Sequence, residues 1–459
     1  MTLIKSISGI RGTIGGAPSD NLTPIDIVKF ASSYGTWISQ KSDNKKIVVG
    51  RDARISGPMV QDLIVNTLIG LGINVVDLEL ATTPTVEMAV VAENAAGGII
   101  ITASHNPKQW NALKLLNEKG EFISGADGEA ILEIAEKGEF TFATVDHLGK
   151  LTKTDYLDYH IQKILELDLV KPELIKAKKY KVAVDVVNSV GGIAIPKLLN
   201  ALGVTDVVLI NGEPTGHFAH NPEPLAEHLG EISSVVKADK CQLGIVVDPD
   251  VDRLAFISDD GEMFGEEYTL VACADYVLKH TPGATVSNLS STRSLKELTE
   301  KAGQKYFASA VGEVNVVECM KANNAIIGGE GNGGIILPEL HYGRDALVGI
   351  ALFLTHLAES NMTTSGLRAL YPTYMMSKNK AELQEGTNVD LILEKICDKY
   401  KKQPVNTIDG VKIDFDGDWV HLRKSNTEPI IRIYAESASL TTAENLTKKI
   451  LQDIGDLLE

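Results

Sequence analysis

The chain has 459 residues and a formal net charge of −17, with 44 lysines and arginines against 61 aspartates and glutamates. Proteins that bind nucleic acid or anionic membranes usually carry a basic patch, so this charge argues against both kinds of partner. Hydrophobic residues make up 44% of the chain and charged residues 23%, which is typical of a folded globular protein. Because a single core usually divides beyond roughly 250–300 residues, we expect several domains.

The cysteines and the N-terminal sequence favour a cytoplasmic location. No CxxC pair occurs, so neither a disulfide framework nor a thiolate zinc site is expected from Cys241, Cys273, Cys319 and Cys397. The first residues lack a signal-peptide pattern, and no stretch approaches the roughly 18 consecutive apolar residues of a membrane span. We therefore expect a cytoplasmic protein without membrane segments.

A strand–helix–strand pattern occurs over residues 46–78, returns over 181–210, and recurs more weakly from residue 286. In the first two copies the helix ends on Leu-Gly, where glycine suits the left-handed position after a helix. β-Branched strands separated by helices indicate parallel sheets covered on both faces, hence an α/β fold. We predict strands at 46–50, 73–78, 181–187, 204–210 and 286–289, and helices at 60–71, 195–202 and 294–303.

The last part of the chain has a different pattern. Residues 411–415 and 419–422 predict two strands of a hairpin around an Asp-Gly turn, residues 430–435 a further strand, and residues 442–458 an amphipathic helix. This predicts a small α+β domain that begins near Tyr371, with other domain boundaries near residues 150–158 and 255–262.

The first candidate functional loop, residues 102–107 (TASHNP), follows an apolar run at 98–101. A serine at the carboxyl end of a parallel strand, here Ser104, lies where open α/β sheets bind ligands, and Asn-Pro keeps the loop out of a helix. His105 or Lys114 could polarise or deprotonate a nearby hydroxyl. The alternative is a polar turn with an inert serine.

The second candidate loop, residues 248–253 (DPDVDR), follows a strand pattern at 243–247. Alternating carboxylates at a strand end can direct three oxygens, from Asp248, Asp250 and Asp252, toward one hard cation such as Mg²⁺. The loop lacks the glycine and glutamate of an EF-hand. Since three adjacent carboxylates repel one another without a cation, the pattern favours a metal site over a solvated acidic turn.

The third candidate loop, residues 328–334 (GGEGNGG), resembles a dinucleotide-binding glycine motif. A strand pattern at 335–337 follows it, so the helix that such a motif requires is missing. The carboxylate of Glu330 and the amide of Asn332 suit bidentate contacts to sugar hydroxyls. The alternative is a flexible turn without a ligand.

The fourth candidate loop, residues 423–429 (RKSNTEP), lies in the predicted tail domain. Arginine offers a planar bidentate fork, and hydroxyl, amide and loop N–H groups can complete a phosphate cradle. The alternative is a surface loop with two salt bridges. The candidate phosphate ligands are Arg423, Ser425, Asn426, Thr427 and, in the next strand, Arg432.

Taken together and in this order, the four loops resemble the signature loops of the α-D-phosphohexomutase superfamily, and residues 8–12 (SGIRG) resemble its N-terminal signature. The resemblance covers essentially the whole chain. It implies three related α/β domains with mixed, largely parallel sheets and a C-terminal α+β domain, around a central cleft. The expected domains are 1–153 with the serine loop, 154–256 with the aspartate loop, 257–370 with the sugar loop and 371–459 with the phosphate loop.

The resemblance also implies a reaction. Ser104 would carry a phosphoryl group and transfer it to the free hydroxyl of a hexose phosphate. The resulting 1,6-bisphosphate would turn round and return its other phosphate to the serine, which suits chemistry that depends mainly on positioning and charge neutralisation. Mg²⁺, a covalent phosphoserine and glucose or glucosamine 1,6-bisphosphate as activator are the expected cofactors.

The same resemblance implies the residue roles. Arg11, His105 and Lys114 would assist proton movement, and Arg253 would stabilise the transferring group together with Mg²⁺. The expected catalytic residues are Arg11, Ser104, His105, Lys114 and Arg253. The expected metal ligands are Ser104, Asp248, Asp250 and Asp252. The expected sugar ligands are Glu330 and Asn332.

The sugar is the least determined feature. Residues 311–313 (VGE) are similar to the Val-Gly-Asp of relatives that act on glucosamine phosphate, whereas residues 425–427 (SNT) are more similar to other relatives. Residues 341–345 (HYGRD) resemble archaeal-type members, and Gly334 replaces a histidine that many relatives carry. We expect interconversion of glucosamine 6-phosphate and glucosamine 1-phosphate; the alternative is a phosphomannomutase/phosphoglucomutase. A hexose phosphate is the expected partner, with the chain a monomer or homodimer.

Two other classes of function remain open. A sugar-phosphate phosphatase could use Ser104 or the aspartates, although residues 102–106 lack the Gly-x-Ser-x-Gly pattern of a nucleophile elbow. A non-catalytic sugar-phosphate sensor could use the same residues without turnover. Release of inorganic phosphate distinguishes a phosphatase from a mutase, and the effect of replacing Ser104 distinguishes a sensor.

Overall fold

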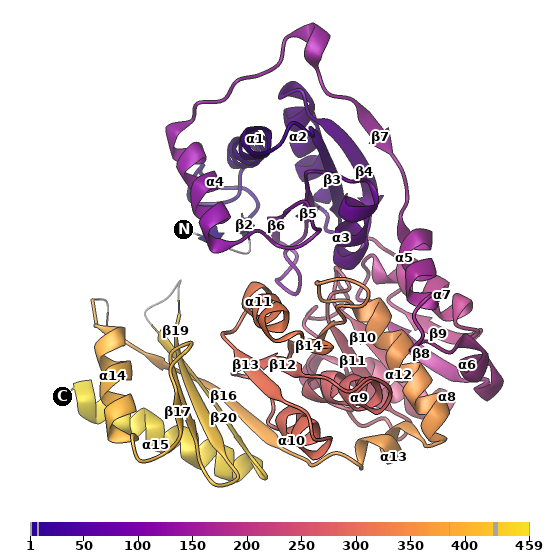
Figure 1. Cartoon of the computed structure of the whole chain (residues 1–459), viewed down its shortest axis with the longest axis vertical. Coiled ribbons are helices and arrows are strands. Elements are labelled where there is room, and N and C mark those ends of the chain that lie inside the picture. Colours follow the sequence, from indigo (N-terminus) through magenta and orange to yellow (C-terminus); the bar gives the residue numbers. More distant parts are fainter. Residues whose placement is uncertain (1, 7–8, 385, 426–429, 459) are drawn as a thin grey trace. The chain divides into compact units, whose positions relative to one another are not determined.

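A computed structural model describes residues 2–6, 9–384, 386–425 and 430–458 (Figure 1). The chain forms two compact units, each built from two segments. The first unit contains Met1–Thr281 and Asn332–Arg368, and the second contains Pro282–Gly331 and Ala369–Glu459. The α/β fold with mixed sheets is confirmed, whereas the exact residue ranges of the four domains stay a prediction.

The first unit opens with a seven-stranded sheet of order β1-β2-β6-β5-β3-β4-β7. Its β3, β4, β5 and β7 pairings are parallel, and β1, β2 and β6 join them antiparallel. Three helices (α1, α2, α4) pack on one face and α3 on the other, as Figure 1 shows. The strands are β1 (Ile4–Ser6), β2 (Gly9–Thr13), β3 (Lys46–Arg51), β4 (Asn74–Leu80), β5 (Gly97–Ile101), β6 (Trp110–Leu116) and β7 (Leu151–Lys153), and the helices are α1 (Pro24–Lys41), α2 (Gly57–Gly70), α3 (Thr83–Ala92) and α4 (Gly125–Lys137).

The second sheet of this unit has the order β11-β10-β8-β9, with β8 parallel to both of its neighbours and β10–β11 an antiparallel hairpin. Its strands are β8 (Lys181–Asp185), β9 (Asp206–Ile210), β10 (Leu243–Val247) and β11 (Leu254–Ser258). The unit also contains η1 (Val145–His147), α5 (Leu157–Leu165), α6 (Pro172–Lys178), α7 (Gly191–Ala201), η2 (Ala226–His228), α8 (Gly230–Asp239), α9 (Glu266–His280), β15 (Gly334–Ile336), α12 (Ala346–Ser360) and α13 (Thr364–Arg368).

The second unit combines a parallel set of strands, in the order β13-β12-β14, with a five-stranded antiparallel sheet of order β16-β20-β19-β18-β17. The parallel strands are β12 (Thr285–Asn288), β13 (Tyr306–Ser309) and β14 (Ile327–Glu330), with helices α10 (Ser294–Lys301) and α11 (Glu313–Asn323). The antiparallel part contains β16 (Met375–Glu382), α14 (Val389–Lys399), β17 (Val405–Asn406), β18 (Val411–Asp414), β19 (Trp419–Lys424), β20 (Ile430–Ser437) and α15 (Leu440–Leu458).

The repeated strand–helix–strand pattern and the tail hairpin are both confirmed. Gly72 and Gly203 follow their helices with φ of +79° and +85°, the left-handed conformation that the Leu-Gly endings predict. Sequence reasoning did not find α12, whose first thirteen residues are all buried. A helix that is apolar on every side has no amphipathic stripe, so its 3.6-residue period is hidden.

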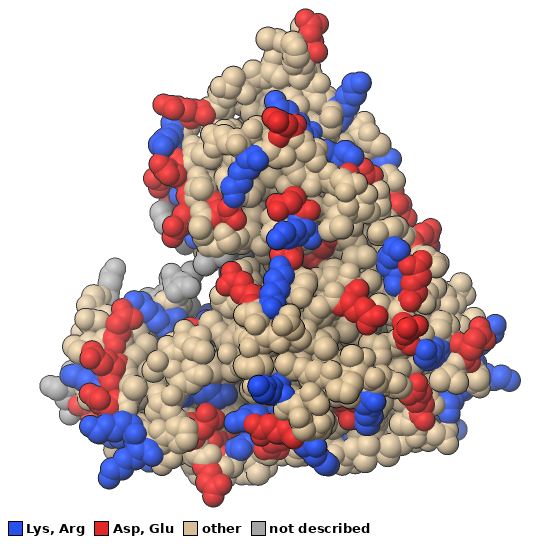
Figure 2. Space-filling view, in the orientation of Figure 1, with Lys and Arg blue, Asp and Glu red and all other residues tan. Residues whose placement is uncertain are grey.

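Helix hydropathy, the cysteines and the distribution of surface charge complete the description of the fold. Within the described ranges, no helix is both long and apolar enough to cross a membrane. All four cysteines, which lie in the described part, are free. On the face shown in Figure 2, lysines and arginines are interspersed with acidic residues, so the negative net charge is not gathered into one uniform acidic surface there.

Three buried phenylalanines join the second sheet to its covering helices. The ring of Phe353, on α12, stacks on Phe256 at 3.9 Å between centroids and meets Phe264 edge-on at 5.2 Å. We expect Phe353→Ala to lower the free energy of unfolding by about 3–5 kcal/mol, because it leaves a cavity in a packed core.

The matched control is Phe142→Ala, because Phe142 is 53% exposed and its removal leaves no cavity. Urea unfolding followed by circular dichroism measures both variants. Equal midpoints for the two would contradict the assignment of Phe353 to the core.

Candidate active site

The serine loop follows β5 and holds Ser104 in a strained conformation. Ser104 has φ of +48°, a left-handed value that residues with a side chain rarely adopt. Such strain persists only where surrounding contacts enforce it, and it is typical of functional sites. The Ser104 backbone N–H donates to the Thr102 hydroxyl at 2.9 Å, and the Ser104 hydroxyl donates to Oδ2 of Asp248 at 2.7 Å.

Arg54 binds the backbone of this loop, and sequence reasoning did not identify it. Its guanidinium is 1% exposed and donates to four loop carbonyls. Because one rigid fork fixes several carbonyl oxygens at once, Arg54 determines the path of the loop backbone. The acceptors are the carbonyl oxygens of Ser104 (2.5 Å), Asn106 (2.7 Å), Pro107 (2.9 Å) and Trp110 (2.9 Å).

Asp52 orients Arg54 in turn. Its Oδ2 accepts from Arg54 Nε at 3.0 Å and from the Thr102 hydroxyl at 2.7 Å. Burial raises the pKa of Asp52, and the neighbouring Arg54 partly opposes that rise. The Asp52–Arg54 ion pair is buried. Because Asp52 follows β3 and its partner Thr102 follows β5, these contacts link the ends of the two strands.

The aspartate loop is the turn of the β10–β11 hairpin. Asp248, Asp250 and Asp252 are fully buried, and one oxygen of each lies within 4.8 Å of the others. Between the last two, Val251 has φ of +63°, which is strained for a β-branched residue. The turn therefore directs three carboxylates to one place at the cost of local strain.

Two cations and one hydroxyl, from three distant segments, contact these carboxylates. Oδ2 of Asp250 accepts from the Thr83 hydroxyl at 2.6 Å and from Lys114 Nζ at 2.7 Å. Oδ2 of Asp252 accepts from Arg344 Nη2 at 2.7 Å and from Lys114 Nζ at 3.2 Å. Burial alone would raise the pKa of Asp252, but Arg344 and Lys114 hold it well below its usual range.

The three aspartates fit a hard cation. Among the described residues, Oδ1 of Asp250 and Oδ1 of Asp252 are buried without a hydrogen-bond partner. Burial and the two neighbouring carboxylates raise the pKa of Asp248 well above its usual range. Buried oxygens that lack donors and repel one another are stabilised by a divalent ion, and carboxylate oxygens are the ligands that Mg²⁺ prefers.

Lys114 and His105 have opposite electrostatic surroundings. Burial lowers the pKa of Lys114, but Asp250 and Asp252 outweigh burial and raise it above its usual range, so the ammonium stays protonated. Burial and the charge of Arg253 lower the pKa of His105 to about 2, so its imidazole is neutral near pH 7. Nδ1 of His105 lies 3.4 Å from the Ser104 hydroxyl oxygen.

Two further predicted residues lie beside this group. Arg253 is 9% exposed, its backbone N–H donates to Oδ1 of Asp248 at 3.1 Å, and its Nη1 lies 3.7 Å from Glu223. Arg11, on β2, is close enough to lower the pKa of His105. The first unit thus brings the five predicted catalytic residues and the three predicted carboxylate ligands together.

The predicted sugar ligands fall in different units. Glu330, at the end of β14 in the second unit, accepts from Asn288 Nδ2 at 2.8 Å and from the Gly312 N–H at 3.0 Å. Asn332, in the first unit, accepts from the Gly334 N–H at 3.2 Å. The strand predicted after this loop is present as β15, so the exclusion of a dinucleotide motif holds.

The predicted phosphate loop connects β19 and β20. The N–H of Ser425 donates to the Ile430 carbonyl at 3.1 Å, which closes the loop. Arg423 and Arg432 are directly opposite in the strand register, and Arg423 pairs with Asp409 at 2.7 Å. Two like charges opposite each other repel, so a bound anion would reduce the repulsion between these two arginines. Five predicted or motif residues lie outside the described ranges: Ser8, Asn426, Thr427, Glu428 and Pro429.

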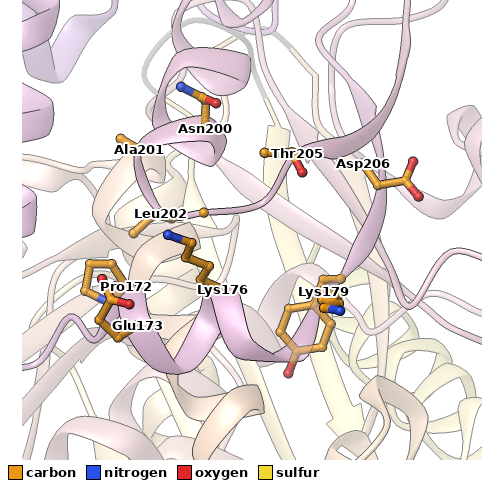
Figure 3. A pocket seen from close by; sticks show the side chains of 11 residues that line it. Pro172, Glu173, Lys176, Lys179, Asn200, Ala201, Leu202, Thr205 and Asp206 are labelled. Carbon is orange, nitrogen blue, oxygen red and sulfur yellow. The ribbon is translucent and has the colours of Figure 1, made fainter.

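A surface depression near α6 is unrelated to these loops. Figure 3 shows it between α6 and the segment that joins α7 to β9. Its lysines, Lys176 and Lys179, are exposed. The residues that line it include none of those predicted for the site, so it offers no alternative for the chemistry.

Sequence reasoning missed Asp52, Arg54, Thr83 and Arg344. A signal existed for the first two, since residues 51–54 (RDAR) directly follow the strand predicted at 46–50, as the serine and aspartate loops follow theirs. The rule that ligands bind at the carboxyl ends of parallel strands applies there equally. No comparable local signal marks Thr83 or Arg344.

Comparison with known proteins identifies the family. Models of the phosphoglucomutase/phosphomannomutase family match all four parts of the chain in order. They match alpha/beta/alpha domain I over residues 3–142, domain II over 155–261, domain III over 265–374 and the C-terminal domain over 378–452.

Individual relatives agree with the family models over nearly the whole length. A phosphoglucomutase/phosphomannomutase of Thermococcus kodakarensis is 34% identical, covering 93% of this chain and 94% of that protein. A phosphoglucosamine/phosphogalactosamine mutase of Sulfurisphaera tokodaii is also 34% identical, covering 96% and 97%. A crystal structure of a phosphoglucomutase/phosphomannomutase family protein from Burkholderia thailandensis shares the fold, with a TM-score of 0.85, 23% identity and coverage of 99% and 98%. With its ordered domains and the serine and aspartate loops in place, the chain belongs to the phosphoglucomutase/phosphomannomutase family and is a phosphohexomutase.

Proposed function

We propose that this phosphohexomutase interconverts glucosamine 6-phosphate and glucosamine 1-phosphate, with Ser104 as the phosphoryl carrier. The observation that carries the proposal is the strained serine, whose hydroxyl donates to one of three buried carboxylates at 2.7 Å. A nucleophile beside a cation site is the arrangement that phosphoryl transfer requires. A cytoplasmic location and a monomeric or homodimeric state stay predictions from the sequence.

The residues that would hold Mg²⁺ are Asp248, Asp250 and Asp252, joined by an oxygen of the phosphorylated serine. When bound, Mg²⁺ supplies positive charge to the oxygens of the transferring phosphoryl group. Lys114 keeps two of the carboxylates fixed and partly neutralised through its contacts at 2.7 and 3.2 Å. Preorganised charges of this kind stabilise a transition state without reorganisation during the reaction.

The remaining residues of the first unit would bind and orient the reacting groups. The neutral imidazole of His105 can exchange a hydrogen bond with the Ser104 hydroxyl, while Arg11 and Arg253 provide permanent positive charge for phosphate oxygens. Arg54 keeps the serine loop in one conformation, so the hydroxyl oxygen stays aimed at the carboxylates. Holding the reacting groups in this orientation lowers the entropic part of the barrier to phosphoryl transfer.

Two carboxylates support glucosamine as the substrate. Glu330 accepts from the N–H of Gly312, and the next residue, Glu313, is a buried carboxylate at the start of α11. Glucosamine phosphate carries an amine at C2 where glucose and mannose phosphates carry a hydroxyl, and carboxylates favour the protonated amine. The name of the Sulfurisphaera tokodaii relative agrees, whereas that of the Thermococcus kodakarensis relative supports the alternative, a phosphomannomutase/phosphoglucomutase.

The substrate is tested by phosphorus NMR with Mg²⁺ and a trace of hexose 1,6-bisphosphate. Glucosamine 6-phosphate, glucose 1-phosphate and mannose 1-phosphate are supplied separately. We expect isomerisation without inorganic phosphate, fastest for the glucosamine compound. Faster turnover of glucose or mannose phosphate would establish the alternative, and steady phosphate release would indicate a phosphatase.

Replacement of the carrier gives a direct test. We expect Ser104→Ala to lose at least about 10³-fold of the turnover, because the variant lacks the hydroxyl that would carry the phosphoryl group. Wild type incubated with ³²P-labelled glucose 1,6-bisphosphate should gain label that the variant lacks. Ser234→Ala, at an exposed position on α8, is the control and should keep normal activity. Labelling or near-normal turnover of Ser104→Ala would refute the assignment.

The metal site is tested at the central carboxylate. We expect Asp250→Asn to lower activity at least about 10²-fold and to weaken activation by Mg²⁺, because it removes a charge from the ligand set. Asp260→Asn, in an exposed turn, serves as the control. Activity is titrated against Mg²⁺ after chelator treatment, with circular dichroism to confirm folding. An unchanged Mg²⁺ response in Asp250→Asn would exclude Asp250 as a ligand.

A further inference from the structure

A second group of metal-binding residue types lies in the first unit, apart from the three aspartates. It consists of His160 on α5 together with His341 and Asp345, which precede α12. The side chains of His160 and Asp345 are fully buried, and that of His341 is 11% exposed. None of the three residues takes part in the proposed phosphoryl transfer.

Three ligand atoms converge in this group. Nε2 of His160 lies 2.8 Å from Oδ2 of Asp345, and Nε2 of His341 lies 3.3 Å from the same oxygen. The three atoms lie within 4.8 Å of one another. Ligands of a tetrahedral zinc ion, at about 2.0–2.1 Å from the metal, are about 3.3–3.4 Å apart. The 3.3 Å spacing of His341 and Asp345 matches this value, whereas the 2.8 Å spacing of His160 and Asp345 would have to lengthen by about 0.5 Å when the ion binds.

The opposite atom of each side chain has its own partner. Nδ1 of His160 lies 3.0 Å from the Thr85 hydroxyl, and Nδ1 of His341 lies 3.4 Å from a carboxylate oxygen of Glu87. Oδ1 of Asp345 accepts from two backbone N–H groups at the start of α12, at 2.8 and 3.3 Å. Metal-bound histidines almost always have such a partner on the second nitrogen, which fixes the tautomer and the ring orientation.

We propose that His160, His341 and Asp345 bind a divalent transition-metal ion, with zinc as the first candidate and a water molecule in the fourth position. Two imidazoles with one carboxylate select an ion of this class rather than Mg²⁺, which prefers oxygen ligands. Thr85 would serve as the outer hydrogen-bond partner of His160, and Glu87 lies within ion-pair distance of His341. The site is separate from the aspartate loop and takes a different metal.

The location of this site gives the ion a positioning role. Arg344, the neighbour of Asp345 in the chain, donates to Asp252 at 2.7 Å. Thr83, which begins the helix that carries Thr85 and Glu87, donates to Asp250 at 2.6 Å. An ion held by His160, His341 and Asp345 would therefore tie down both segments that contact the aspartate loop.

The test measures metal content in the full, untagged chain. The protein is treated with a chelator, incubated with Zn²⁺ in excess Mg²⁺, desalted, and analysed by mass spectrometry for bound metals. We expect about one zinc per chain, and with Co²⁺ instead, the visible absorption of a tetrahedral complex. Zinc should also raise the melting temperature of the metal-free protein, because it binds the folded state.

Four variants, two of them controls, locate the ion. His160→Gln and His341→Gln should each lower the affinity for zinc at least about 10-fold, while His147→Gln, at an exposed position, should leave it unchanged. Asp250→Asn should keep zinc while losing the Mg²⁺ response, which separates this proposal from the phosphoryl-transfer proposal.

Absence of tightly bound zinc in the wild type would overturn the inference and leave a purely hydrogen-bonded His–Asp–His cluster. Zinc lost in Asp250→Asn, or retained fully in both histidine variants, would also overturn it.

Discussion

The burial of three carboxylates at one hairpin is the constraint on which the rest of the site depends. An isolated buried carboxylate is very costly, so the fold has to supply cations and donors from elsewhere. Lys114 from β6 and Arg344 from the segment before α12 meet this requirement at Asp252. Two oxygens remain without hydrogen-bond donors among the described residues, on Asp250 and Asp252, and a bound divalent ion would satisfy them.

The serine loop has to meet a related geometric requirement, the orientation of the Ser104 hydroxyl. A hydroxyl that carries a phosphoryl group has to stay aimed at the cation site, and a free loop would lose that orientation. The left-handed conformation of Ser104 is held by the buried guanidinium of Arg54, which Asp52 orients. Hydrogen bonds from Arg54 to the loop carbonyls, and from the Ser104 N–H to Thr102, compensate the strain at the serine.

The two units differ in their chemical content. The first holds the serine, the aspartates and their cations, which in our proposal act on the transferring phosphoryl group whatever sugar carries it. The second holds Glu330 and the opposed pair Arg423 and Arg432, whose groups suit hydroxyl, amine and phosphate recognition. The residues therefore indicate the phosphoryl-transfer chemistry more clearly than they indicate which sugar is bound. A bisphosphate that is bound in two orientations also favours few and adaptable sugar contacts, which leaves little sequence signal for the sugar.

The sequence by itself determined the α/β repeats, the tail hairpin, and the places of Ser104 and the three aspartates in loops that follow strands. Each depends on residues close in the chain, namely a strand followed directly by a polar loop, so local pattern was sufficient. Only the tertiary structure decided the partners of those residues, such as Arg54 for the serine loop and Arg344 for the aspartates. Helix α12 escaped detection because burial on every side removes the amphipathic period. The His160–Asp345 contact joins residues 185 positions apart, and no local rule of sequence encodes such a pairing.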